Sequence, residues 1–311
     1  MRIAIVGAGL AGLSCAQVLQ TYGHTVCVFD KGRGPGGRMA TRRVDTAFGT
    51  IAFDHGAQYF TARDPGFVQT VARWSADGVA ARWPAAGDDA WVGTPGMNAL
   101  IKAIGQDLDV AWNSRVEAIV TSDGGWRLDP VSDGVFDAVV VATPAEQAVG
   151  LLEPHDPAMT AAARGCPSEP CWTAMVAFAE RIAVPLDVVR DRRIIGWAAR
   201  NSAKPGRDRP EAWVIQANPD WSRVHLEDAV EGVVDTLLSA LAVEAEAPLP
   251  EPIVRIGHRW RYARVRARDD GALWDADRRI GAVGDWLLGP RVESAWLSGR
   301  KLADQILGPA R

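Results

Sequence analysis

Glycines dominate the first segment of the chain that could do chemistry. An apolar run at residues 2–6 leads into Gly7, and Gly9 and Gly12 complete a Gly-x-Gly-x-x-Gly pattern. Gly7 permits a tight turn, Gly9 lets a pyrophosphate approach the backbone, and Gly12 lets a helix pack closely on a strand. The unpaired N–H groups at the start of such a helix favour an anion. The residues predicted to form this phosphate site are Gly7, Gly9, Leu10, Ala11 and Gly12.

The elements around these glycines give the pattern its weight, because a Gly-rich turn alone is a weak signal. Residues 3–6 are typical of a buried parallel strand, and residues 13–20 of a helix with one apolar face. A second strand is expected at 25–29, and Asp30 at its end could accept hydrogen bonds from ribose hydroxyls. The alternative is an ordinary strand–helix–strand unit whose glycines serve packing only.

A second Gly-rich segment follows at residues 31–39 and is not needed for NAD. Gly36 and Gly37 would let a loop run close under a cofactor, and Arg38 could offer paired donors to phosphate oxygens. A surface loop rich in Gly and Arg is the alternative. Together with Asp30, the residues assigned to the cofactor site here are Lys31, Gly36, Gly37, Arg38 and Met39.

With these segments the chain resembles the FAD-dependent amine oxidase superfamily. Residues 279–286 are similar to its late strand ending in Gly-Asp, and residues 289–299 to its closing helix. The resemblance implies that Asp285 binds the flavin ribityl chain and that the helix N-terminus points at the flavin pyrimidine carbonyl. It assigns to the cofactor site the residues Gly284, Asp285, Trp286, Val292 and Glu293.

Within that superfamily the chain resembles the renalase branch at residues 53–61, 93–98 and 257–262. The likeness covers nearly the whole chain but carries no alignable motif at about 166–254. It implies FAD held without a covalent bond, because the closing segment contains no Cys. The further FAD contacts that it implies are Gly56, Ala57, Gln58, Val116 near the adenine, and Thr143.

Since both ends of the sequence would hold one ligand, they must share a domain. We expect an α/β fold with a Rossmann-type FAD-binding domain, of the glutathione reductase and p-hydroxybenzoate hydroxylase kind, and a second α+β substrate domain. The predicted FAD-binding domain comprises 1–60, 91–150 and 266–311, and the substrate domain 61–90 and 151–265. Strands are expected at 110–120, 136–142, 171–178 and 212–217, a helix at 226–241, and exposed turns at 204–207 and 247–250.

Polar and aromatic groups that the family pattern would place over the flavin ring are the candidates for catalysis. They are Tyr59, Thr173, His258 and Trp260, with Gln58 beside them. His258 could instead be structural, and Tyr59 could simply fill the domain junction. The chain has 13 Trp against 3 Tyr, and aromatic walls suit a planar substrate. Trp286 and Trp296 are the further aromatic site candidates, whereas Trp74, Trp126 and Trp221 are expected to be structural.

Composition adds little that is specific. A chain of 311 residues has room for two cores, and its net charge of −4 does not indicate a nucleic-acid or membrane partner. No apolar run could cross a bilayer, so a cytoplasmic protein is expected. The four cysteines lack metal spacing, and no metal site is predicted. Arginines considered for the phosphates of a substrate are Arg63, Arg193, Arg200 and Arg207.

The resemblance implies an oxidase for the 2- and 6-dihydro isomers of NAD(P)H. A hydride would pass to flavin N5, giving NAD(P)⁺, and O₂ would then be reduced to H₂O₂. The partners are thus a dihydronicotinamide nucleotide and O₂, with the protein a monomer or homodimer. An amine or polyamine oxidase is one alternative, and a flavin-binding protein without oxidase activity is another.

Overall fold

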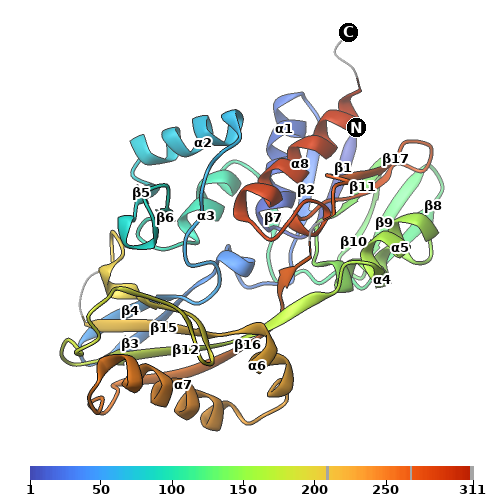
Figure 1. Ribbon diagram of the computed structural model, residues 1–311. Helices are drawn as coiled ribbons and strands as arrows, with labels where there is room; N and C mark the ends of the chain where they lie inside the picture. The colour runs from blue at the N-terminus through green and yellow to red at the C-terminus, as the bar shows by residue number, and fades with distance from the viewer. Residues whose placement is uncertain (208–209, 267, 309–311) are drawn as a thin grey trace.

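A computed structural model describes residues 1–207, 210–266 and 268–308. Two main sheets, each with its own helices, build a mixed α/β fold of two units (Figure 1). The two ends of the chain lie together in one unit, as the blue and red segments of Figure 1 show. The predicted fold class is therefore confirmed.

A six-stranded sheet forms the first unit, in the order β17-β18-β11-β1-β2-β7. β1 lies between β11 and β2 and is parallel to both, whereas β17 closes one edge as an antiparallel strand. The strands are β1 (Arg2–Val6), β2 (Thr25–Phe29), β7 (Asp109–Ala111), β11 (Ala138–Val141), β17 (Leu273–Asp275) and β18 (Ile280–Ala282).

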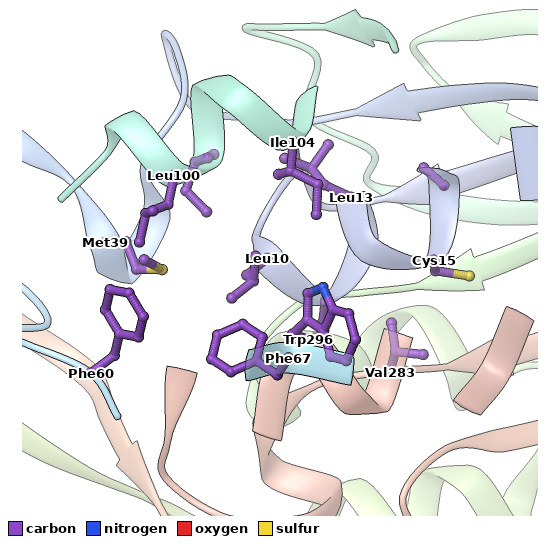
Figure 2. Close-up of a cluster of buried hydrophobic side chains, with 14 of the residues drawn as sticks. Leu10, Leu13, Cys15, Met39, Phe60, Phe67, Leu100, Ile104, Val283 and Trp296 are labelled. Atoms are coloured by element: carbon purple, nitrogen blue, oxygen red, sulfur yellow. The ribbon is translucent and has the colours of Figure 1, made fainter. Parts of the chain in front are cut away.

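Helices from both ends of the sequence cover one face of this sheet. The helices α1 (Leu10–Thr21) and α8 (Val292–Leu307) pack together at Gly299, where a Cβ would come within 2.1 Å of the Ala11 carbonyl oxygen. Figure 2 shows the apolar cluster beside them, in which the rings of Phe67 and Trp296 lie 5.3 Å apart. The helices α2 (Pro65–Ala76) and α3 (Ala99–Gly105) add side chains to the same cluster.

A smaller layer covers the opposite face. It consists of the sheet β10-β9-β8 and two helices, whose side chains share one apolar cluster with the large sheet. Its elements are β8 (Ala118–Ser122), β9 (Gly125–Asp129), β10 (Ser132–Phe136), α4 (Ala145–Leu152) and α5 (Pro157–Arg164).

The second unit is a five-stranded antiparallel sheet in the order β13-β14-β15-β12-β16. Helix α7 covers one face, and the hairpin of β3 and β4 packs on the other through Ile51 and Phe53. The elements are β12 (Ser168–Phe178), β13 (Val188–Arg192), β14 (Ile195–Arg200), β15 (Glu211–Ala217), β16 (Val254–Val265), α6 (Pro219–Val224), α7 (Val230–Ala245), β3 (Thr41–Thr46) and β4 (Gly49–Asp54).

Short elements complete the described chain. The strands β5 (Ala80–Arg82) and β6 (Trp91–Gly93) pair with each other, and single 3-10 turns lie at Gly37–Met39, Pro84–Ala86, Asn201–Ala203 and Asp285–Leu287. Within the described ranges, none of the helices has both the length and the apolar composition that a membrane span requires.

Three predicted elements were wrong in detail. The expected strand 110–120 is interrupted, because residues 112–117 leave the sheet between β7 and β8. The expected helix 226–241 begins four residues later, as α7. The expected exposed turn 204–207 carries Lys204 and Arg207, which are 2% and 5% exposed. By contrast, residues 247–250 lie largely on the surface, as predicted.

Candidate active site

One large cavity, of about 1490 Å³, is lined by residues of both units. Its wall includes the turn after β1, the end of β2 and segments of β12, β15 and β16. Most residues predicted for the cofactor or for catalysis lie on this wall. They are Gly7, Gly9, Leu10, Ala11, Asp30, Lys31, Gly36, Gly37, Arg38, Met39, Gly56, Ala57, Gln58, Tyr59, Val116, Thr143, Trp260, Gly284, Asp285 and Val292.

The glycines of the first turn differ in what surrounds them. A Cβ on Gly9 would meet no atom within 4 Å, so this backbone faces open space on the cavity wall. Gly7 has a φ of +115°, a conformation that favours glycine. A Cβ on Gly12 would lie 2.1 Å from the Gly7 carbonyl oxygen. Gly9 therefore leaves room for a ligand, whereas Gly12 leaves room for the helix to approach the strand.

Asp30 ties the two Gly-rich segments together at the end of β2. One carboxylate oxygen accepts from the Ala8 N–H at 2.7 Å, and the other from the Gly32 N–H at 2.6 Å. These bonds orient the first turn and the following loop toward one another. A carboxylate fixed at this point can also accept from a ribose hydroxyl, as the sequence predicts.

Arg38 and Asp285 face each other across 247 residues of sequence. In the Arg38 guanidinium, Nη1 donates to Asp285 Oδ2 at 2.8 Å, and Nη2 donates to Asp285 Oδ1 at 2.6 Å. This fork geometry orients both groups at the cavity wall. Thr143 lies on the same wall, and its buried Oγ1 has no hydrogen-bond partner among the described residues.

Several predicted site residues lie behind the wall instead of on it. Gly12 is buried within α1, against the Gly7 carbonyl oxygen, and Thr173 and Trp286 are completely buried. The Trp286 indole donates to the Thr143 carbonyl oxygen at 3.2 Å, so it supports the wall from behind. Trp296 packs against Phe67 in the apolar cluster of Figure 2 and is not a cavity residue.

Glu293 and His258 are also outside the cavity wall. The Glu293 carboxylate accepts from the backbone N–H groups of Arg63 and Asp64 at 2.6 and 2.7 Å, and thereby anchors the start of α2. His258 lies behind Trp260, with ring centroids 4.3 Å apart. The direct catalytic roles expected of His258 and Thr173 are thus not supported by their placement.

Two aromatic rings stack on the cavity wall, and the sequence predicted only one of them, Tyr59. Tyr59 and Trp197 stack with ring centroids 5.1 Å apart and an interplanar angle of 25°. The Arg190 guanidinium lies 4.6 Å from the Trp197 ring centroid. No sequence motif marks Trp197 or Arg190, because they reach Tyr59 from the second sheet, Trp197 on β14 and Arg190 on β13.

His55 is a further residue that sequence reasoning missed. Its ring stacks on Trp260 at 5.2 Å and meets His258 edge-on at 4.9 Å. The Trp260 indole donates to the His55 carbonyl oxygen at 2.8 Å. Burial lowers the pKa of His55 to about 4, with a smaller effect from the neighbouring His258. His55 is therefore neutral at pH 7, and a proton on it is disfavoured in the folded protein.

We expect this buried imidazole to make the protein sensitive to acid. Between the unfolded pKa of 6.5 and the folded pKa of about 4, the unfolded chain binds the proton and the folded chain does not. Stability should therefore fall as the pH drops through this window, by up to about 3 kcal/mol. The check is the free energy of unfolding from pH 7 to pH 4, in wild type and in His55→Phe. An equally steep loss in the variant would rule His55 out.

A buried charged group, here called the Asp54 cluster, comprises Asp54, Lys204 and Arg207. Asp54 Oδ2 accepts from Arg207 Nη2 at 2.5 Å and lies 3.4 Å from Lys204 Nζ. Its Oδ1 accepts from Thr41 Oγ1 at 2.7 Å and from the Met97 N–H at 2.9 Å. Burial alone would raise the pKa of Asp54, but Lys204 and Arg207 hold that pKa below its usual value.

Two of the arginines considered for substrate phosphates are already paired with carboxylates. Arg207 binds Asp54, and Arg200, which is 1% exposed, lies between Asp187 and Glu211. Of the four arginines considered, Arg63 alone lines the cavity, and Arg193 lies outside it.

Comparisons with known proteins identify the class of protein. Residues 5–74 match the NAD(P)-binding Rossmann-like domain family. Residues 84–307, more than half of the chain, match the flavin-containing amine oxidoreductase family. The chain therefore belongs to the flavin-containing amine oxidoreductase family.

Solved structures share the fold over nearly the full chain. A putrescine oxidase with bound putrescine superposes with a TM-score of 0.74 and 13% identity, covering 99% of both chains. The cyclohexylamine oxidase of Brevibacterium oxydans IH-35A gives a TM-score of 0.69 and 13% identity, covering 98% of both chains. At this identity the likeness extends to the fold alone.

Curated relatives match over a short segment. A 15-cis-phytoene desaturase of Synechococcus elongatus is 55% identical over 40 residues, which is 13% of this chain and 8% of the relative. A 4,4'-diapophytoene desaturase of Staphylococcus aureus strain Newman is 42% identical over 45 residues, 14% of this chain and 9% of the relative. The matched segments are thus a small part of these relatives.

The residues on the cavity wall fit the FAD that this family uses. The backbone at Gly9 faces open space in the cavity, and the Thr143 hydroxyl has no hydrogen-bond partner among the described residues. Asp30 and the pair of Arg38 and Asp285 supply the acceptors and donors that ribose, phosphate and ribityl groups need.

Proposed function

We propose that the protein oxidises the 2- and 6-dihydro isomers of NAD(P)H to NAD(P)⁺ with bound FAD. In this proposal the Gly-rich turn and Asp30 would hold the dinucleotide of FAD, and Asp285 and Thr143 would hold the middle of the molecule. Residues 56–58 and Trp260 would form the wall at the flavin ring. The isomer, rather than an amine, is proposed because of the charge of the cavity.

Basic side chains outnumber acidic ones on the described cavity wall, nine to four. The basic ones are Lys31, Arg38, Arg63, Arg115, Arg190, Arg259, Arg261, Arg264 and Arg291, and the acidic ones are Asp30, Glu117, Asp191 and Asp285. Glu227 pairs with Arg259 and Arg261, and the FAD diphosphate brings two more negative charges. An excess of positive charge persists, which attracts a dinucleotide and repels a cationic amine.

The side chains near Tyr59 and Trp260 are assigned to binding and orienting the substrate rather than to proton transfer. Tyr59 and Trp197 present a stacked aromatic wall, and Trp260 is held by its bond to the His55 carbonyl oxygen. Such walls hold a planar dihydronicotinamide with its saturated carbon in one place. Bound FAD supplies the redox chemistry, taking a hydride at N5 and passing the electrons to O₂ to give H₂O₂. Because the product ring is aromatic, no strong base is needed.

Anaerobic mixing tests the proposal. The purified protein is mixed with the 2- and 6-dihydro isomers made by borohydride reduction of NAD⁺, and the flavin band at about 450 nm is followed. We expect rapid bleaching by an isomer and release of H₂O₂ on admission of air. The value of kcat/KM should fall as salt is added, because the attraction between an anionic substrate and a basic cavity is screened.

Putrescine serves as the matched comparison, since the fold is shared with a putrescine oxidase. Bleaching by putrescine and by neither isomer would replace the proposal with amine oxidation. Bound flavin that no donor bleaches, and that reoxidises slowly in air after chemical reduction, would favour a flavin-binding role without oxidase activity.

A further inference from the structure

A buried cation lies directly behind the cavity wall. Lys204 Nζ donates to Gln58 Oε1 at 3.0 Å, and Gln58 lines the cavity. The Gln58 amide nitrogen donates in turn to the Gly56 carbonyl oxygen at 3.0 Å. The side chains of both Lys204 and Asp54 are 0% exposed. The ammonium group is therefore one side chain away from the cavity and is shielded from water.

Among the described residues, the Asp54 cluster carries one more positive charge than negative charge. Two cations, Lys204 and Arg207, share the single carboxylate of Asp54 among the charges that the structure describes there. His55, the next titratable group along the chain, is neutral and offsets nothing. The Trp83 ring lies 5.2 Å from Lys204 Nζ and offers it a π face, which carries no net charge. The field of the excess charge is screened less in this interior than in water.

We propose that the excess positive charge of the Asp54 cluster raises the electron affinity of the bound flavin and strengthens anion binding beside it. The inference rests on the placement of the flavin ring at residues 56–58, given above, and not on the identity of the substrate. Reduction adds negative charge to the flavin, and a nearby buried cation stabilises that form. Lys204 touches neither flavin nor substrate in this role and acts through its field.

Lys204→Gln tests the charge with little change of shape. Glutamine keeps a donor for Gln58 but carries no charge, and the remaining pair of Asp54 and Arg207 is neutral. We expect the reduction potential of bound FAD to fall, measured by equilibration with a reference dye. Sulfite, an anion that adds to oxidised flavin, should bind about tenfold more weakly in a titration of the flavin absorbance.

The double variant Asp54→Asn/Lys204→Gln separates charge from structure. It removes one charge of each sign, so Arg207 leaves the same net charge as in wild type. Sulfite affinity and potential should return toward the wild-type values. If the double variant binds sulfite as weakly as Lys204→Gln does, the proposal is overturned, because lost contacts would then explain the effect.

Arg207→Gln removes the same charge from the other cation that pairs with Asp54. It is the variant to use if Lys204→Gln does not retain FAD. Wild-type potential and sulfite affinity in either FAD-loaded variant would also overturn the proposal. Neither readout involves a dihydronicotinamide, so failure of the proposed substrate would be seen separately.

Discussion

Substituting two glycines of the same turn should separate folding from cofactor binding. In Gly12→Ala the new Cβ would lie 2.1 Å from the Gly7 carbonyl oxygen and 3.0 Å from the Ala142 Cβ, and the first of these is backbone. Either α1 or the turn must move, so we expect the free energy of unfolding to fall by about 3 kcal/mol. Denaturant unfolding of the FAD-free protein measures this directly, without a contribution from the ligand.

Gly9→Val is the matched substitution, because a Cβ on Gly9 meets nothing within 4 Å and its φ of −77° suits any residue. The fold should lose less than about 1 kcal/mol, as for other substitutions at a helix N-cap. The branched side chain would occupy the space into which a pyrophosphate comes, so FAD should bind at least about tenfold more weakly. Wild-type FAD affinity in Gly9→Val would show that the cofactor does not approach this backbone.

The two Gly-rich segments were predictable because their chemistry is local. The turn after β1 needs residues within one strand and one helix, and the spacing of the glycines between those two elements predicts different roles for Gly7, Gly9 and Gly12. That the two ends of the chain lie together was predicted because one ligand would be held by both of them, and β1 and β18 do share one sheet. The interruption of the expected strand 110–120 coincides with the polar residues 113–115, where Asn113 has a φ of +55° and the chain leaves the sheet.

Residues that meet across long stretches of sequence were not predictable in this way. Lys204, Pro205, Gly206 and Arg207 have the composition of an exposed turn. Lys204 and Arg207 are nevertheless buried, because Asp54, 150 residues before Lys204, ends β4 with a carboxylate that faces them. Trp286 was misplaced for a related reason, since the motif fixes Asp285 at the wall but leaves the next side chain to pack inward. A sequence pattern locates a backbone segment more reliably than it gives the direction of each side chain.

Removing the carboxylate of the Asp54 cluster should have the largest effect on stability of any charge substitution considered. Asn at position 54 leaves Lys204 and Arg207 buried side by side with no opposite charge among the described residues. Breaking a buried ion pair by loss of one partner costs about 3–5 kcal/mol. Asp54→Asn should therefore lower the free energy of unfolding by that amount in a denaturant titration at pH 7.

Asp220→Asn provides the control, because its pair with Arg223 at 2.9 Å is exposed and should contribute less than about 1 kcal/mol. Asp54→Asn/Lys204→Gln should recover part of the loss, since one of the two uncompensated cations is removed with the carboxylate. Equal stability of Asp54→Asn and Asp220→Asn would mean that water reaches the Asp54 cluster. In that case Lys204 would be screened from the cavity, and its field could not act on the flavin.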